Sequence, residues 1–180
     1  MYKIFEGVSL RDFTKEDINF KIEWINNPSN NTYLHYDLPL EYEKTLQWFV
    51  NKDNSKRMDC IIEYENEPVG VIGLLAIDTN NSKAEYYITI GSESHKHKGV
   101  ATKASLLLLE YAFNDLSLNK VYLNVDADNE IACNLYEKLG FACEGIFIED
   151  LKRNGSFIDR KRYSILRKKW NDEWRLNERN

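Results

Sequence analysis

The stretch that decides the fold runs from Tyr86 to Ala101 and has the sequence YYITIGSESHKHKGVA. It begins with a strand-like segment, continues through a polar turn, and reaches Gly99 just before the apolar segment of a helix. The first N–H groups of a helix lack internal partners and lie at the positive end of its dipole. A glycine there lets a ligand approach the backbone closely. The stretch is compatible with a phosphate-binding loop and equally with a plain turn, so the rest of the chain must decide.

The composition is that of an ordinary folded protein. The 180 residues suit a single domain, residues 1–180, with a C-terminal tail from about residue 167 to 180. The net charge of −5 argues against nucleic-acid binding through bulk electrostatics. The longest apolar segments are too short to span a membrane, and no signal-peptide pattern is present. Three cysteines without a CxxC pair argue against disulfides and zinc, so we expect a cytoplasmic protein without a metal.

Hydrophobic periodicity predicts a mixed α+β domain of about seven strands and about four helices. The predicted strands are Val8–Phe13, Met58–Tyr64, Val69–Asp78, Lys83–Gly91, Val121–Val125, Phe141–Leu151 and Phe157–Leu166. The predicted helices follow the Thr14 cap, begin near Glu41, follow Gly99 to about Asn114, and span Asn129–Leu139 with a buried face of Ile131, Leu135 and Leu139. A strand–helix–strand order in the second half implies one parallel pair of strands.

Two segments resemble motifs of the GNAT superfamily of N-acetyltransferases. The first, Lys96 to Ala101, corresponds to the pattern (Gln or Arg)-x-x-Gly-x-(Gly or Ala), with Lys96 as a departure. The second, Asn129 to Phe141, has the sequence NEIACNLYEKLGF and is similar to Asn-x-x-Ala-x-x-x-Tyr-Glu-Lys-x-Gly-Phe. The resemblance covers roughly Val8 to Leu166. It implies a twisted, mostly antiparallel sheet whose central parallel strands splay apart.

The resemblance implies acetyl-CoA as the cosubstrate. Its pyrophosphate would be held by the backbone N–H groups of Lys98, Gly99, Val100, Ala101 and Thr102. Its pantetheine arm would pair with the exposed edge of the strand that contains Ile88 and Ile90, as an added strand does. Asn129 would help to position that arm.

Acetyl transfer to an amine needs a proton acceptor, an oxyanion donor and an acid. An amine with a pKa near ~10 is mostly charged at pH 7, so a base must remove its proton. Tyr136 is the acid that the motif implies, although helix geometry alone favours a core aromatic. Glu85 is the predicted base, although an exposed strand glutamate is the commoner interpretation, and Asp126 is an alternative that also fits a turn. A free backbone N–H between Ile88 and Ile90 would stabilise the oxyanion.

Five further residues are interpreted from their positions. His35 and Tyr36 lie in an aromatic loop that lines the acceptor pocket in this superfamily, so both are predicted to bind substrate, although a lone loop histidine is more often a surface residue. Arg153 belongs to a basic turn that could meet a diphosphate or simply face solvent. Cys133 and Cys143 are predicted to be small buried hydrophobic residues rather than nucleophiles.

The acceptor is a small-molecule amine by this resemblance, and three hypotheses stay open. The segments Glu23–Pro28 and Thr45–Phe49 look most like enzymes that acetylate a nucleotide-linked 4-amino sugar, as in the pseudaminic acid pathway, so direct attack by that amine in a ternary complex is the leading hypothesis. The segment Phe157–Arg167 is similar to a branch that also holds polyamine and ribosomal-protein alanine acetyltransferases, which is the alternative. The third hypothesis is a non-catalytic module that binds acetyl-CoA. A homodimer is compatible with each.

Overall fold

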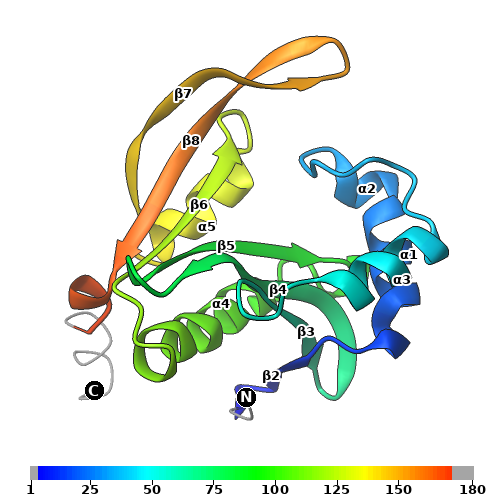
Figure 1. Ribbon diagram of the computed structural model, residues 1–180, viewed down its shortest axis with the longest axis horizontal. Helices are drawn as coiled ribbons and strands as arrows, with labels where there is room; N and C mark the ends of the chain where they lie inside the picture. The colour runs from blue at the N-terminus through cyan, green and yellow to red at the C-terminus, as the bar shows by residue number, and fades with distance from the viewer. Residues whose placement is uncertain (1–3, 172–180) are drawn as a thin grey trace.

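The computed structural model describes residues 4–171, whose strands form one mixed sheet in the order β1-β2-β3-β4-β5-β6-β8-β7 (Figure 1). The strands are β1 (Ile4–Phe5), β2 (Val8–Asp12), β3 (Met58–Tyr64), β4 (Glu67–Asp78), β5 (Lys83–Ile90), β6 (Lys120–Asp126), β7 (Ala142–Arg153) and β8 (Ser156–Leu166). Among the described strands, β5 and β6 pair in parallel and the other neighbours are antiparallel. The predicted fold class is confirmed, and the two-residue strand β1 is an addition to it.

The helices of the described chain are α1 (Ile18–Asn26), α2 (Pro28–Asn31), α3 (Tyr42–Asn51), α4 (Val100–Glu110) and α5 (Glu130–Lys138). The predicted capping box of Thr14 and Asp17 is present and leads through a short 3-10 turn into α1. The short helix α2 follows α1 directly, because Asn27 caps it and Pro28 suits a first helical position. Gly140 follows α5 with φ +86°, as predicted for a C′ glycine.

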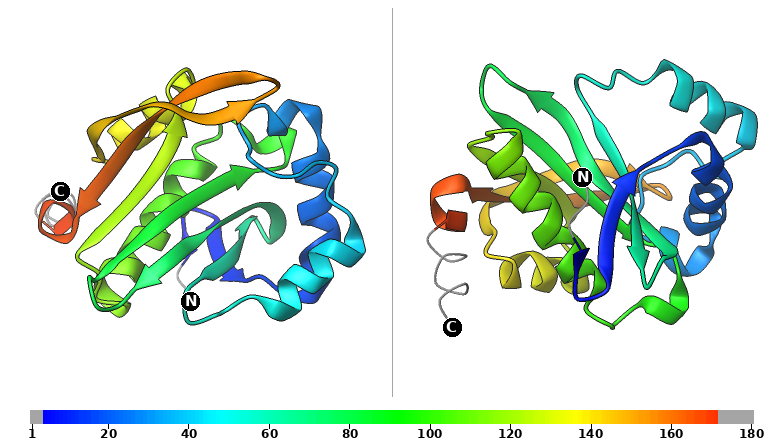
Figure 2. Two further views of the ribbon diagram at one scale, coloured as in Figure 1. Left: turned by 45° about the horizontal axis from the view of Figure 1, so that its top comes forward. Right: turned by 90° about the horizontal axis from the view of Figure 1, so that it is seen from below.

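Helices cover both faces of the sheet. Figure 2 shows α4 and α5 on one side and α1 to α3 on the other. Alternation along β3 divides its side chains between two cores, with Cys60 and Ile62 in the core that includes α4, and Ile61 in the core that includes α1. This alternation explains why Met58–Tyr64 could be predicted to the residue.

The sheet splits open at the parallel pair. The pairing of β5 with β6 ends at Glu85 opposite Tyr122, beyond which β5 stays paired with β4 and β6 with β8. Figure 1 shows the two strands side by side at one end and far apart at the other. The predicted splayed strands are therefore present, and the site is built around their divergence.

Two side-chain predictions were wrong and one lies partly outside the described residues. Ile131 is 77% exposed, whereas Leu139 is buried as predicted, because the buried face of α5 is centred on Cys133 and Tyr136. Cys143 is exposed on β7, whereas Cys133 is buried as predicted. Residues 167–171 of the predicted C-terminal tail are helical, and residues 172–180 lie outside the described part.

Candidate active site

The N-terminus of α4 is an open backbone cradle. Gly99 caps the helix with φ +75°, and the first helical bond runs from the Lys103 N–H to the Gly99 carbonyl at 3.1 Å. The N–H groups of Val100, Ala101 and Thr102 therefore precede the helical ladder. A Cβ built on Gly99 would meet nothing within 4 Å, so the space in front of the backbone is open. These features fit a pyrophosphate at the positive end of the helix dipole.

Lys96, the departure from the family pattern, is engaged at the periphery of this cradle. Its Nζ lies 2.7 Å from Glu93 Oε2 and 3.4 Å from the Ser29 carbonyl oxygen. The lysine links the loop to α2 and leaves the backbone N–H groups to receive an anion.

The splayed edge of β5 offers hydrogen-bonding groups to a ligand. The Gly91 N–H donates to the Val69 carbonyl on β4 at 2.9 Å. Because N–H groups alternate in direction along a strand, those of Tyr86, Ile88 and Ile90 face away from β4, toward the gap left by β6. Ile88 and Ile90 thus lie where an extended pantetheine arm could add to the sheet.

Asn129 caps α5, its Oδ1 accepting from the Ala132 N–H at 3.2 Å. This contact explains the asparagine as a cap. Its predicted role at the pantetheine arm stays a prediction.

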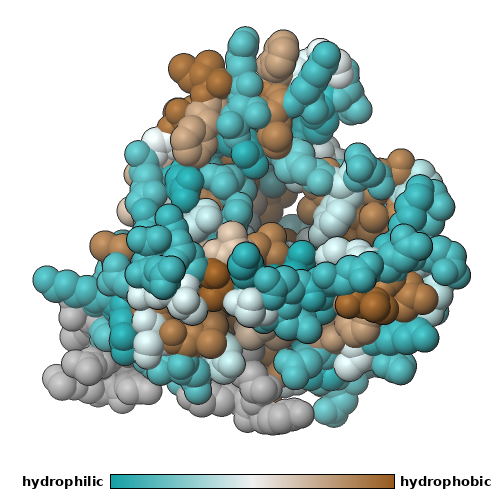
Figure 3. Space-filling view, in the orientation of Figure 1, coloured by the Kyte–Doolittle hydropathy of each residue, from teal (hydrophilic) through white to brown (hydrophobic). Residues whose placement is uncertain are grey.

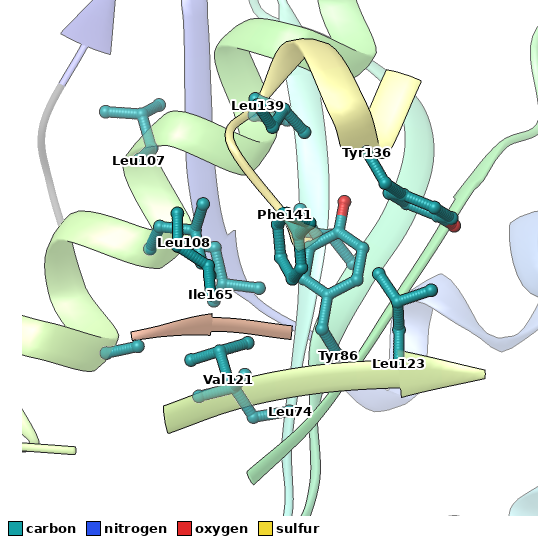
Figure 4. Close-up of a cluster of buried hydrophobic side chains, with 14 of the residues drawn as sticks. Leu74, Tyr86, Leu107, Leu108, Val121, Leu123, Tyr136, Leu139, Phe141 and Ile165 are labelled. Carbon is teal, nitrogen blue, oxygen red and sulfur yellow. The ribbon is translucent and has the colours of Figure 1, made fainter. Parts of the chain in front are cut away.

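Tyr136 is buried, being 8% exposed, within a cluster of aromatic rings. Its ring centroid lies 6.0 Å from that of Tyr86, 5.9 Å from Phe141 and 6.2 Å from Tyr163. Figure 4 shows its hydroxyl oxygen on the side of the ring away from Phe141, and no described residue bonds to that oxygen. Burial raises the pKa of Tyr136, which keeps the phenol protonated at neutral pH. A protonated hydroxyl without a partner is able to act as a proton donor.

The opposite face of the splayed strands is polar. Val121, Leu123 and Val125 of β6 lie in the core with α4. By alternation, Tyr122, Asn124 and Asp126 lie on the other face. There the Asn124 Nδ2 donates to Glu85 Oε1 at 3.0 Å across the point of divergence. The structure therefore places the predicted base Glu85 at the mouth of the split.

His35 and Asp126, which sequence reasoning treated separately, are in direct contact. His35 Nε2 lies 2.8 Å from Oδ1 of Asp126, whose side chain is 1% exposed. The other oxygen of Asp126 contacts Arg153 at the tip of the β7–β8 hairpin. Arg153 also donates to the Thr32 carbonyl at 3.1 Å. These contacts tie the loop after α2, the end of β6 and the hairpin tip together over the split.

Tyr36 lies beside a buried cationic cluster formed by Lys21, Lys52, Arg57 and Asp59. The Lys21 Nζ lies 3.5 Å from the centroid of the Trp48 ring, and burial lowers the pKa of Lys21 to about 8. Asp59 is shared by Arg57 at 2.7 Å and Lys52 at 3.1 Å. Two cations thus pair with one carboxylate, and Lys21, Lys52 and Arg57 all lie against the Trp48 ring.

Sequence reasoning missed this cluster, although a signal was present. Lys21 lies three residues after Ile18 and four before Ile25, which places a lysine on the apolar face of α1. A lysine at such a position must find a partner or lose its charge.

The cationic cluster opens into a cavity of about 380 Å³. Its lining residues are Trp48, Asn51, Lys52, Asp53, Lys56, Arg57, Leu75 and Ala76. Leu75 pairs with Glu85 across β4 and β5, so this cavity opens near the predicted base, Glu85. Figure 3 shows a hollow between the hairpin at the top of the view and the side of the molecule formed by α1 and α2. The acceptor side of the molecule is therefore concave and mixed in charge.

Comparison with known proteins identifies the family. Residues 8–142 match the family model described as an acetyltransferase (GNAT) domain. The chain belongs to the GNAT acetyltransferase family. It is similar to a spermidine N(1)-acetyltransferase of Vibrio cholerae, with 33% identity over 166 residues that cover 91% of this chain and 95% of the relative.

Two solved structures extend the GNAT comparison. The spermidine N-acetyltransferase from Vibrio cholerae in complex with CoA and spermine has a TM-score of 0.83 at 30% identity, covering 91% of this chain and 98% of that chain. A dodecameric structure of the same enzyme in an intermediate state has a TM-score of 0.80 at 27% identity, with coverages of 93% and 98%. This GNAT chain is therefore an acetyl-CoA-dependent N-acetyltransferase.

Two further properties concern the described residues as a whole. No helix among residues 4–171 is long and apolar enough to cross a membrane. In that same range, no group of three or more His, Cys, Asp or Glu side chains could hold a metal ion.

Proposed function

We propose that the protein acetylates a terminal primary amine of a polyamine of the spermidine class. The observation that carries this proposal is the similarity to a spermidine N(1)-acetyltransferase along nine-tenths of the chain. Glu85 supplies a carboxylate without a cationic partner among the described residues, on the acceptor face of the sheet. This acceptor was the alternative to a nucleotide-linked amino sugar in the sequence analysis, and the relatives favour it.

The proposed chemistry assigns one task to each group. When bound, acetyl-CoA supplies an acetyl thioester. The free N–H groups of Ile88 and Ile90 lie where they can donate to the carbonyl oxygen as it gains charge. Glu85 takes a proton from the ammonium so that the amine can attack, and Tyr136 gives a proton to the leaving sulfur. The acceptor nitrogen loses two protons overall, since one ends on the thiol and the other passes through Glu85 to solvent.

A second acceptor class, a nucleotide-linked 4-amino sugar, is favoured by one specific observation. Lys52 and Arg57 pair with a single carboxylate, Asp59, beside the cavity near Glu85, and Lys21 adds a third cation against the Trp48 ring that lines this cavity. Such an excess of positive charge repels a polyamine and suits a phosphate-bearing acceptor. A polyamine would instead rely on Glu85 and on the exposed acidic residues of the loop before α3.

A thiol-release screen separates the two classes. The purified chain is given acetyl-CoA with spermidine, with a uridine diphosphate 4-amino sugar, and with an N-terminal alanine peptide. Turnover on spermidine above the others supports the polyamine proposal. Turnover on the nucleotide sugar that is lost in Lys21→Met would identify the nucleotide-linked amino sugar as the acceptor class. Absence of thiol release with every amine, while acetyl-CoA still binds, supports the non-catalytic module.

The location and assembly follow as proposals. The free cysteines Cys60, Cys133 and Cys143 suit a reducing compartment, so we propose the cytoplasm. The dodecameric Vibrio cholerae relative supports self-assembly of this chain, at least as a homodimer.

A further inference from the structure

Asn124 occupies the point where the sheet divides. It follows Tyr122, the last β6 residue paired with β5, by two positions on the same face of the strand. Its Nδ2 donates to Glu85 Oε1 at 3.0 Å. The amide orientation follows from this contact, because the reverse orientation would set an amide oxygen against a carboxylate.

The other end of the Asn124 amide has no partner. Its Oδ1 is buried and receives no hydrogen bond within the described residues. A buried acceptor left in this state costs about 1–3 kcal/mol. Native proteins satisfy most such groups, so an orphan beside a functional carboxylate indicates a missing donor.

The surroundings indicate a cationic donor. Glu85 Oε1 is held by Asn124, and Oε2 accepts no hydrogen bond from a described residue. Two other titratable groups lie near Glu85, namely Tyr122 opposite it on β6 and Arg162 on β8, and the Arg162 guanidinium carbon lies 4.1 Å from the centroid of the Tyr122 ring. Burial and then the charge of Glu85 raise the pKa of Tyr122, which keeps that phenol neutral. The contact between Asn124 and Glu85 therefore leaves one acceptor oxygen of each side chain, Asn124 Oδ1 and Glu85 Oε2, without a donor among the described residues.

We propose that Asn124 positions the acceptor amine, holding Glu85 through its N–H and receiving an N–H of the ammonium at Oδ1. This inference rests on the proposed acetylation of a primary amine. An ammonium has three donors, so it can bind both oxygens and still direct its third hydrogen elsewhere. The two oxygens hold the nitrogen at the mouth of the split, and the proton moves to the carboxylate that Asn124 has oriented. Asn124 acts on binding and on geometry, and Glu85 acts on the proton.

The test compares Asn124→Leu with Asn81→Leu. Leucine keeps the branching of asparagine at Cγ, although it is larger, and has neither a donor nor an acceptor. The Asn81 Nδ2 donates to Asp78 Oδ2 at 2.7 Å in the β4–β5 turn, so the control removes the same kind of contact outside the site. Initial rates are measured with spermidine and acetyl-CoA varied separately, and acetyl-CoA binding is measured by calorimetry. The same pair of variants is then made in a Glu85→Gln background.

We expect Asn124→Leu to affect the kinetics of the amine but not the binding of acetyl-CoA. Asn124→Leu raises KM for the amine by about tenfold or more, as expected for a lost bond to a charged group, and lowers kcat. Its affinity for acetyl-CoA stays within about twofold of wild type, since the backbone cradle is untouched. In the Glu85→Gln background the same substitution has a much smaller effect, because the carboxylate that it orients is gone. A merely structural asparagine would show neither this difference between the two substrates nor this coupling.

The opposite result is equally clear. Kinetic parameters for Asn124→Leu equal to those of Asn81→Leu overturn the inference while leaving the acetyltransferase intact. Should Asn124→Leu fail to fold, Asn124→Ser undergoes the same measurements, with the same expected result. If the wild-type protein acetylates no amine, the proposed function is wrong, and the inference about Asn124 is then wrong as well. This outcome differs from the first, in which the wild type is active and only the role of Asn124 is contradicted.

Discussion

Tyr136 carries its hydroxyl at the edge of an aromatic cluster, without a partner among the described residues. The motif implied this residue as the acid, whereas helix geometry alone favoured a core aromatic. The structure combines both descriptions, because the ring packs against Tyr86 and Phe141 while the oxygen stays unengaged. Its burial could not be predicted from the pattern Ile131, Leu135 and Leu139, since the buried face of α5 is centred on Cys133 and Tyr136.

Replacing Tyr136 with phenylalanine tests this separation of roles. We expect kcat to fall by about 100-fold or more, the usual contribution of a general acid. The free energy of unfolding should change by less than about 0.5 kcal/mol, because the ring is kept and no hydrogen bond is lost. Tyr163→Phe is the control, since Tyr163 donates to Glu137 Oε1 at 2.8 Å within the same cluster. A Tyr136→Phe enzyme with wild-type kcat at every pH would exclude this residue as the acid.

Lys21 yields a prediction about stability. Its pKa is lowered to about 8 from 10.5 by burial, so between these pH values the unfolded chain binds more protons than the folded chain. Stability therefore rises with pH across this window, and at lower pH the buried charge costs about 3 kcal/mol. Lys21→Met removes that cost. Its advantage over wild type should be largest below pH 8 and vanish, apart from a constant packing term, by about pH 10.5.

Urea unfolding at several pH values measures this difference. Lys138→Met, at an exposed position of α5, serves as the control and should show no comparable trend. A difference between Lys21→Met and wild type that does not depend on pH would mean that Lys21 is not desolvated in the native state.

The element that depends most on one residue is the N-terminus of α4. Gly99 adopts φ +75°, and alanine in that conformation costs about 1–2 kcal/mol. Gly99→Ala should therefore lower stability modestly, since nothing lies within 4 Å of the new Cβ. Calorimetry should show a larger loss of affinity for CoA than for the amine, because the methyl group enters the space for the pyrophosphate. Unchanged CoA affinity would contradict the assignment of this loop.

The hairpin of β7 and β8 supplies the second element-scale prediction. Arg153 joins Asp126 to the Thr32 carbonyl, so Arg153→Ala should free the loop of residues 32–38 and leave Asp126 buried with a single partner, His35. Faster amide exchange in that loop and a higher KM for the amine are expected, with acetyl-CoA affinity unchanged. Arg160→Ala is the control, because Arg160 pairs with Asp150 within the same hairpin. Equal rates of amide exchange for residues 32–38 in both variants would contradict the role of Arg153 in holding this loop.

The sequence alone predicts helices and strands, but it does not predict which distant side chains come into contact. Met58–Tyr64 was placed to the residue because its side chains alternate between two cores. The contact of His35 with Asp126 was beyond prediction, since 91 residues separate them and Arg153 completes the group from a third segment. Lys21 could have been noticed on its apolar helix face. The orphan oxygen of Asn124 exists only in three dimensions.

At the scale of the molecule, the splayed sheet gives the two substrates separate routes to the point where β5 and β6 diverge. In the proposed function, the α4 cradle and the β5 edge bind acetyl-CoA, and the opposite polar face with Glu85 receives the amine. This separation fits direct attack in a ternary complex, because neither substrate needs to leave before the other binds. The charges of the acceptor side are balanced between Glu85 and the cluster around Asp59, which is why the relatives, rather than the cleft itself, favour a polyamine.

The most direct test of the central claim is mass spectrometry of the reaction products of the purified chain with acetyl-CoA and spermidine. The account predicts N-acetylspermidine in equal amount to the CoA released, with formation lost in Tyr136→Phe and in Glu85→Gln. Release of CoA without an acetylated amine, or no product with any amine while acetyl-CoA binds, would contradict it.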